Sequence, residues 1–320
     1  MTKILVTGAL GQIGTELVPY LRIKYGTDNV IASSKDKKGS RDVIKADGLF
    51  EILDITNRAS IAGILKKHRV TAIYHLASLL SATGENDPQA LWEVNLNGLI
   101  NILEVAREHN CSIFFPSSIA VFGPDSPKDK TPQDTVTRPT SIYGISKISG
   151  ELLCDYYHNK YGIDIRGIRY PGVISSAAMP GGGTTDYAVH IFYDAIRSGR
   201  YTCFLEENSS IDMIYMPDAV EGAVKLMEAD PTKLKHRNAF NVSAITVTPK
   251  ELAAEIKKHI PDFKIDYQVD PVRQAIADSW PDSLDDSAAR LEWGWDPGYN
   301  LAAMTEDMLT VLKEKLRPEN

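Results

Sequence analysis

The chain has 320 residues, of which 43% are hydrophobic and 24% are charged. This length and balance are typical of a globular protein with a sizeable core, and they exclude the intrinsically disordered and fibrous classes. The formal net charge of -7, with both signs interspersed along the chain, provides no broad basic face for nucleic acid or for an anionic membrane surface.

Three cysteines, Cys111, Cys154 and Cys203, are widely separated and odd in number. This pattern fits neither a disulfide framework nor a metal-ligand cluster, and it predicts reduced, buried thiols. The N-terminus leads directly into the strand-like residues 4–6 without a signal-peptide core, and no apolar stretch approaches the roughly 18 residues of a membrane span. We therefore expect a cytoplasmic protein that makes no use of a membrane.

Short apolar runs alternate with longer segments of helical period over about the first 170 residues. This alternation predicts an α/β fold, a doubly wound parallel sheet with helices on its faces. The predicted strands are 3–7, 29–32, 48–53, 72–76, 112–116 and 163–169, and the predicted helices are 15–24, 58–68, 88–109 and 141–161.

The regular alternation of strand-like and helical segments ends after Arg169, where Pro171 and the Pro-Gly-rich residues 179–183 predict loops. A helix over 184–199 follows, ending at Gly199. We expect one domain over residues 1–170 and a smaller, interleaved domain over 171–320, some of whose segments return to the first. Its predicted elements are strands 213–215 and 239–242 and helices 217–228, 248–259 and 302–316.

A glycine-rich segment, residues 7–14, follows the first predicted strand and opens the first helix. Its glycines permit a tight turn and close approach of a pyrophosphate, while the helix N-terminus favours negative charge. A tight turn alone needs glycine for steric reasons, but the position inside a βαβ unit favours a dinucleotide site. The expected contacts are Gly8, Gly11, Gln12, Ile13 and Gly14.

Tyr143 and Lys147 lie four residues apart in a predicted helix, so their side chains share one face. An adjacent ammonium stabilises phenolate and lowers a tyrosine pKa from its usual value of about 10, which suits proton exchange with a substrate. Such a pair is common by chance, so a second motif is needed to support it: Ser117 and Ser118 directly follow the fifth predicted strand. Either serine can instead satisfy free backbone donors.

The ordered set of residues 7–14, 116–123 and 143–147 resembles the extended short-chain dehydrogenase/reductase family, whose glycine spacing is also G-x-x-G-x-x-G. Residues 169–175, 183–188, 213–219 and 279–286 resemble signature segments of the L-threonine 3-dehydrogenases within it. The resemblance implies metal-independent oxidation of L-threonine at C3 to 2-amino-3-oxobutyrate, with hydride transfer to NAD. It also implies a homodimer packed through the helices that contain Asn95 and Tyr143.

In that reaction the resemblance implies that Tyr143 removes the hydroxyl proton, Lys147 contacts the nicotinamide ribose and Ser118 orients the reacting oxygen. The further cofactor contacts that it implies are Ser34, Lys35, Asp54, Ile55, Leu76, Ala77, Asn95, Tyr143, Lys147 and Tyr170. The implied substrate contacts are Ser81, Ser117, Ser118, Tyr143, Thr184, Thr185, Asp186 and Trp280.

Several alternatives stay open at this stage. Ser34 stands where the family usually has an aspartate, so NADP is not excluded, and Asp36 can supply the acid instead. His75 is better interpreted as a hydrogen-bonded core histidine than as a catalytic residue. Asn95 can serve helix packing, Trp280 can be core, and the Thr184-Thr185-Asp186 segment can cap a helix.

Two rival functions also remain. A nucleotide-sugar 4-epimerase with tightly bound NAD shares the fold and the Tyr/Lys/Ser machinery. A non-catalytic dinucleotide-sensing protein would use the glycine segment alone.

Overall fold

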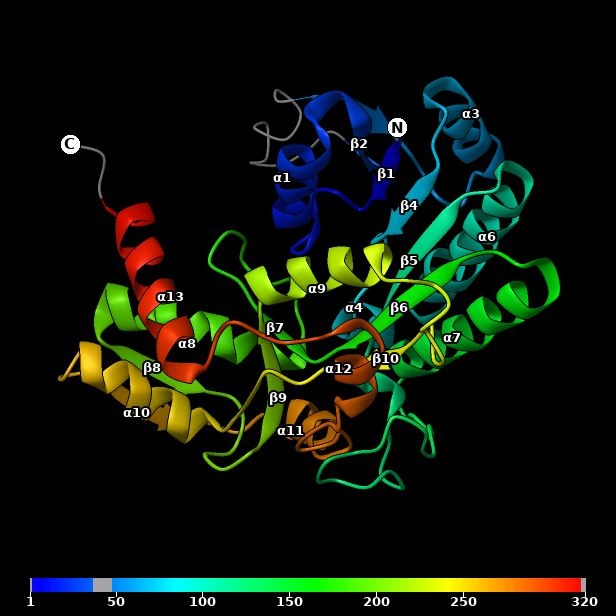
Figure 1. Ribbon diagram of the computed structural model, residues 1–320. Helices are drawn as coiled ribbons and strands as arrows, with labels where there is room; N and C mark the ends of the chain where they lie inside the picture. Colours follow the sequence, from blue (N-terminus) through cyan, green and yellow to red (C-terminus); the bar gives the residue numbers. More distant parts are fainter. Residues whose placement is uncertain (1, 37–47, 318–320) are drawn as a thin grey trace.

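A parallel sheet of seven strands forms the centre of the molecule, as the computed structural model, which describes residues 2–36 and 48–317, shows in Figure 1. The strand order reverses between β1 and β4, which creates a crevice at the carboxyl ends of the strands. The doubly wound parallel sheet is therefore confirmed. In spatial order the strands are β3 (Phe50–Ile52), β2 (Val30–Ser34), β1 (Ile4–Thr7), β4 (Ala72–His75), β5 (Ser112–Ser118), β6 (Ile165–Tyr170) and β10 (Phe240–Asn241).

Helices cover both faces of this sheet because successive side chains of a buried strand point to opposite sides. Ile4 and Val6 contact one layer, whereas Leu5 between them contacts the other. The first layer contains α1 (Gly14–Tyr25), α9 (Met216–Glu228) and α12 (Ser287–Trp293). The second contains α3 (Arg58–His68), α6 (Gly98–His109) and α7 (Ile142–Tyr161), which lie on the right of Figure 1.

The segment predicted as one helix over 88–109 is divided into three parts. It begins as α5 (Pro88–Trp92), continues through a π-helical turn at Glu93–Asn97 and then becomes α6. The turn contains Asn95, whose side chain binds both backbone groups of Leu79. The helix differs from the prediction because Asn95 is held by the backbone of Leu79, which lies outside the helix, and the sequence of the helix alone does not reveal this contact.

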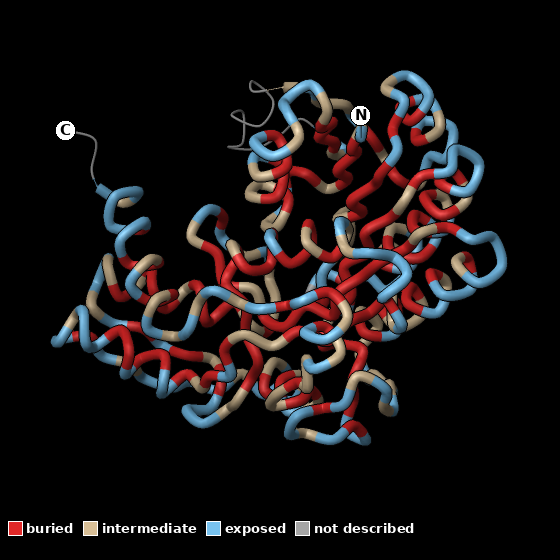
Figure 2. The backbone as a smooth tube through the Cα atoms, viewed as in Figure 1, coloured by how far each residue is buried: buried red, intermediate tan, exposed pale blue. Residues whose placement is uncertain are grey.

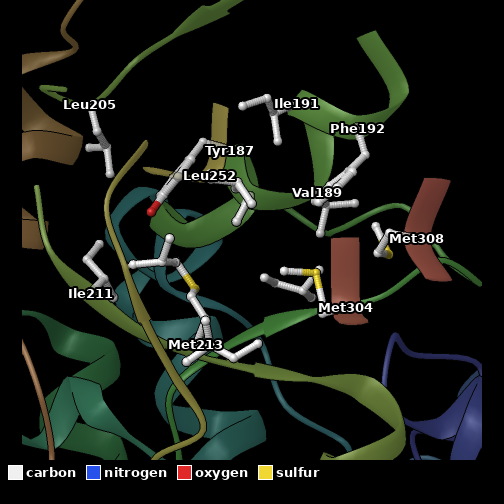
Figure 3. Close-up of a cluster of buried hydrophobic side chains, with 14 of the residues drawn as sticks. Tyr187, Val189, Ile191, Phe192, Leu205, Ile211, Met213, Leu252, Met304 and Met308 are labelled. Carbon is white, nitrogen blue, oxygen red and sulfur yellow. The ribbon is translucent and has the colours of Figure 1, made fainter. Parts of the chain in front are cut away.

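The second part of the molecule packs around its own core, at the left of Figure 1. Figure 3 shows α8 (Tyr187–Ser198) contributing Tyr187, Val189 and Phe192, while Met304 and Met308 come from α13 (Leu301–Lys315). Gly199 ends α8 in a left-handed conformation, as predicted. The remaining elements here are β7 (Gly172–Ile174), β8 (Arg200–Cys203), β9 (Ile211–Tyr215), β11 (Ile245–Val247), β12 (Lys264–Tyr267), α10 (Pro249–His259) and α11 (Pro271–Asp278).

The strand β10 joins the large sheet beside β6, although it follows α8 and α9 in the chain. The two parts are thus interwoven, and a division at residue 171 stays a prediction. Figure 2 shows buried backbone in both the large sheet and the second part. Cys111, Cys154 and Cys203 are free, buried thiols, as expected. Within the described ranges, no helix is both long and apolar enough to cross a membrane.

Candidate active site

A cavity of about 250 Å³ opens where the carboxyl ends of β1, β4 and β5 face the second part of the molecule. The switch point of a doubly wound sheet is the usual place for a ligand. Sixteen of the residues expected at a site line it: Gly8, Gly11, Gln12, Ile13, Gly14, Leu76, Ser81, Ser117, Ser118, Tyr143, Lys147, Tyr170, Thr184, Thr185, Asp186 and Trp280.

The turn between β1 and α1 requires glycine at position 8. Gly8 has a φ of 65°, and a Cβ atom there would lie 2.7 Å from the backbone nitrogen of Ala77. A Cβ on Gly14 would lie 2.7 Å from the backbone of Ala9. The glycines therefore bring the start of α1 close to the ends of β1 and β4, which leaves backbone N–H groups facing the cavity mouth.

The same turn carries groups that suit a pyrophosphate. Among the described residues no side chain caps the start of α1, and the positive end of the helix dipole lies at the cavity; the N–H groups of Thr15, Glu16 and Leu17 already donate to backbone carbonyls of the turn. The Nε2 atom of Gln12 is buried and has no hydrogen-bond partner among the described residues. A buried donor without a partner is costly, and a phosphate oxygen would satisfy it. The residues present thus fit a dinucleotide cofactor.

Tyr143, Ser118 and Lys147 meet at the floor of the cavity. Ser141 caps α7 by accepting the Gly144 N–H at 3.0 Å, which places Tyr143 in the first turn of the helix. The Tyr143 phenol is hydrogen-bonded to Ser118 at the end of β5. The Lys147 Nζ atom donates to the Pro116 carbonyl at 2.8 Å and lies 5.5 Å from the centre of the Tyr143 ring.

Burial shifts the pKa values of Tyr143 and Lys147 more strongly than the sequence suggested. It raises the pKa of Tyr143 to about 12, and the hydrogen bond from Ser118 offsets only part of that increase. Burial also lowers the pKa of Lys147 to about 8, against the opposing effect of the Glu151 carboxylate. The expectation that the pKa of Tyr143 is lowered is wrong, because desolvation of the buried phenol is the largest effect on it and raises it.

A buried ion pair supports this floor, and sequence reasoning missed its role. Glu151 lies one turn after Lys147 and forms a two-point ion pair with Arg169, with contacts of 3.0 and 2.8 Å. It also accepts the Ser117 hydroxyl at 2.5 Å. The spacing of Lys147 and Glu151 on one helix face was a usable signal, but the partner on β6 could only be identified from the fold.

His75 and Asn95 hold the surrounding backbone in place. The His75 Nδ1 atom shares a 2.9 Å hydrogen bond with Thr7, and burial together with the Lys147 charge lowers the His75 pKa to about 3. His75 is therefore neutral, and its interpretation as a core histidine is confirmed. Asn95 binds Leu79 and lies 3.3 Å from the Ser146 hydroxyl. It does not line the cavity, so its contact with the cofactor stays a prediction.

The opposite wall is polar and comes from the second part of the molecule. Asp186 accepts the N–H groups of Gly182 and Gly183 at 2.8 and 2.7 Å, so it ties the glycine-rich loop as the capping alternative predicted. Burial raises its pKa, and those two hydrogen bonds lower it in part. Trp280 both lines the cavity and contacts the core of the second part. The sequence did not single out Ser78, Leu80, Pro116, Pro171, Val173 and Gly183, which complete the lining.

Besides Asn95, five predicted cofactor residues lie outside this lining, namely Ser34, Lys35, Asp54, Ile55 and Ala77. Ala77 is next to Gly8, and its N–H donates to the Thr7 hydroxyl at 3.2 Å. Lys35 and Asp54 form an ion pair of 2.9 Å beyond the ends of β2 and β3. Ile55 is buried in the second helical layer. The adenosine half of a dinucleotide would extend from the glycine turn toward these strand ends.

The fold and this cavity define a Rossmann-fold enzyme of the short-chain dehydrogenase/reductase type. Residues 4–243 match the NAD dependent epimerase/dehydratase family, and the chain belongs to that family. The family resemblance recognised from the sequence is thereby confirmed.

Three proteins illustrate where the chain stands within the family. It is 56% identical to the L-threonine dehydrogenase of Clostridium difficile, with 98% of each chain covered and a TM-score of 0.96. The L-threonine dehydrogenase of Phytophthora infestans is 47% identical over 98% of this chain and 100% of its own, with a TM-score of 0.94. An uncharacterised epimerase/dehydratase of Staphylococcus haemolyticus is 51% identical over 98% and 99% of the two chains.

Proposed function

We propose that this chain oxidises L-threonine at C3 to 2-amino-3-oxobutyrate, with transfer of the hydride to NAD. One observation carries the proposal: a single cavity brings the glycine turn together with Tyr143, Ser118 and Lys147 and with a polar wall from the second part. The near full-length similarity to L-threonine dehydrogenases supports the choice of substrate.

Tyr143 acts on the proton of the C3 hydroxyl. The Ser118 hydroxyl, which is hydrogen-bonded to the phenol, holds the reacting oxygen beside it. Removal of that proton requires phenolate, and positive charge near the ring favours this form. The Lys147 ammonium supplies one such charge, held in place by the Pro116 carbonyl.

NAD would lie on the glycine turn, with its pyrophosphate against Gly11, Gln12 and the start of α1, and Lys147 would bind the nicotinamide ribose. When bound, the oxidised cofactor supplies the hydride acceptor and a second positive charge. Residues of both parts of the molecule surround the cavity, which keeps water from the reacting carbon. No metal enters this mechanism.

The polar wall would bind the amino-acid end of the substrate. Ser81, Thr184 and Thr185 provide hydroxyl groups for the carboxylate, and the Asp186 carboxylate attracts the ammonium. Trp280 would help to close the cavity around the substrate. Ser117 lies beneath this site, where it is bound to Glu151.

Substitution of Tyr143 by phenylalanine tests the proposal. Because the proton acceptor is lost while the ring is kept, we expect turnover of L-threonine with NAD to fall by about 10³-fold or more, with little change in the dissociation constant of NADH. Tyr161→Phe, a surface change on the same helix, is the matched control.

The two rival functions predict different results in the same assay. An epimerase that retains its cofactor would convert UDP-galactose without net formation of NADH, whereas the proposed enzyme produces NADH when L-threonine is added. A dinucleotide-sensing protein would show no turnover, and equal activity of the wild type and Tyr143→Phe would remove the proton-transfer role.

We also infer that two copies associate through α7, which contains Tyr143, and through the helical segment 88–109, which contains Asn95. Large apolar side chains are exposed on these helices, including Trp92, Ile145, Leu152 and Tyr156. The inference predicts a particle of twice the chain mass in light scattering, and a monomer at all concentrations would contradict it.

The cytoplasm is the location that we infer for this enzyme. All three cysteines are free thiols, which is typical of a reducing compartment. Cell fractionation that recovers the protein elsewhere would contradict this.

A further inference from the structure

One buried carboxylate, that of Glu151, lies between two buried cations. Lys147 precedes it by four residues on α7, so the two side chains share one face of the helix. Arg169 reaches it from β6 and contacts both of its oxygens, at 3.0 and 2.8 Å. Glu151, Lys147 and Arg169 are 3%, 6% and 7% exposed, so little water screens their charges from one another.

The other titratable groups that interact with Lys147 are uncharged at neutral pH. Burial raises the pKa of Tyr143 to about 12, and it also raises the pKa of Cys154, two turns after Lys147 on α7. Burial and the Lys147 charge lower the pKa of His75, at the end of β4, to about 3. Among the described residues, Glu151 is therefore the group that supplies negative charge to the Lys147 ammonium.

Neutral contacts fix the position of this ammonium. The Lys147 Nζ atom donates to the Pro116 carbonyl at 2.8 Å, and it lies 5.2 Å from the centre of the Phe115 ring and 5.5 Å from that of Tyr143. One carbonyl and two rings orient an ammonium but do not offset its loss of water. Without the Glu151 carboxylate, two buried cations would face each other, which favours release of the lysine proton.

We propose that Glu151 is a positioning residue that keeps Lys147 protonated, and so maintains the positive charge beside the Tyr143 phenol on which proton removal depends. Arg169 holds the carboxylate in place by its two-point contact and repels the ammonium, so the pair sets the pH range over which Lys147 stays charged. The inference rests on the proton transfer of the proposed function, but its first test needs neither substrate nor cofactor.

That test follows the protonation of Lys147 by NMR of the full chain, labelled at the Cε atoms of its lysines. The Lys147 signal is assigned from its absence in Lys147→Met, and we expect a midpoint at about 8 in the wild type. Glu151→Gln keeps the shape of the side chain and removes its charge. It should lower the midpoint by about one pH unit or more, a roughly 10-fold loss of proton affinity, and an unchanged or higher midpoint would overturn the proposal.

Two further variants separate the effect of charge from that of structure. Arg169→Met removes the repelling cation, so the Lys147 midpoint should rise; if Glu151→Gln does not fold, an unchanged or lower midpoint in Arg169→Met overturns the proposal. Asp164→Asn is the matched control, because Asp164 makes a similar two-point contact with the buried Arg166 beside the start of β6, at 2.9 and 2.8 Å. It should lower the melting temperature without moving the Lys147 midpoint.

Turnover of L-threonine with NAD is the second measurement. If Lys147 must be charged, kcat decreases at alkaline pH, and in Glu151→Gln this decrease should begin at lower pH, with little change in the KM for L-threonine. An alkaline limb at the same pH as in the wild type would overturn the catalytic part of the proposal. A wild type that shows the expected NMR midpoints but does not oxidise L-threonine would refute the proposed function and leave the control of Lys147 by Glu151 intact.

Discussion

Replacement of Lys147 by methionine should stabilise the protein without cofactor while removing its activity. The lysine is 6% exposed, and among the residues that the structure describes its ammonium forms one hydrogen bond, to the Pro116 carbonyl. Burial of a charge with so few partners is unfavourable, which is why the pKa falls from 10.5 to about 8. Methionine has a similar length and no charge to desolvate.

The size of the effect follows from that pKa. A decrease from 10.5 to about 8 corresponds to roughly 3 kcal/mol of unfavourable free energy for the ammonium in the folded state. The lost hydrogen bond to Pro116 offsets about 1 kcal/mol. We therefore expect Lys147→Met to raise the free energy of unfolding by about 2 kcal/mol at neutral pH, while turnover falls by about 10²-fold or more.

The pH dependence of the stability difference between the wild type and Lys147→Met tests whether the buried ammonium causes it. Below about pH 8 Lys147 is charged in both the folded and unfolded states, so the full cost is present. Between about 8 and 10.5 the unfolded chain binds a proton that the folded chain has released, so the stability of the wild type rises with pH relative to the variant. Denaturant titrations from about pH 7 to about pH 9.5 should show the difference between the two proteins shrinking.

An exposed lysine on another helix provides the control. Lys66 is exposed on α3, so Lys66→Met should produce no such pH-dependent difference. The reasoning is refuted if Lys147→Met is less stable than the wild type at neutral pH, or if their difference is independent of pH.

Two further substitutions probe the same cavity. Gly8→Ala places a Cβ atom 2.7 Å from the Ala77 nitrogen at a φ of 65°, so we expect both a lower melting temperature and at least about 10-fold weaker binding of NADH in calorimetric titration; unchanged affinity would contradict the role of the turn. Ser118→Ala removes a hydrogen bond that lowers the Tyr143 pKa, so the rise of kcat with pH should move to higher pH and kcat at neutral pH should fall about 10²-fold. An unshifted pH profile would show that Ser118 does not act on the phenol.

Secondary structure was predictable wherever a periodic segment was long or bounded by a residue with a clear backbone preference. The boundaries of α7 follow from Ser141 as its cap and from the left-handed Gly162 at its end. Short elements such as β7 and α4 (Ser81–Asn86) were not predicted, because they are too short for a hydrophobic period to repeat often enough to be recognised. They are held by partners that are distant in the sequence.

The sequence by itself determined the Rossmann fold and the glycine turn, because these depend on local spacing and on the order of elements, and its family resemblance indicated most of the residues that line the cavity. Only the tertiary structure decided how those residues behave. The pKa of Tyr143 rises and that of Lys147 falls because both are enclosed by segments from elsewhere in the chain. The Glu151–Arg169 pair beneath them joins α7 to β6, a contact that exists only once the helix has packed on the sheet.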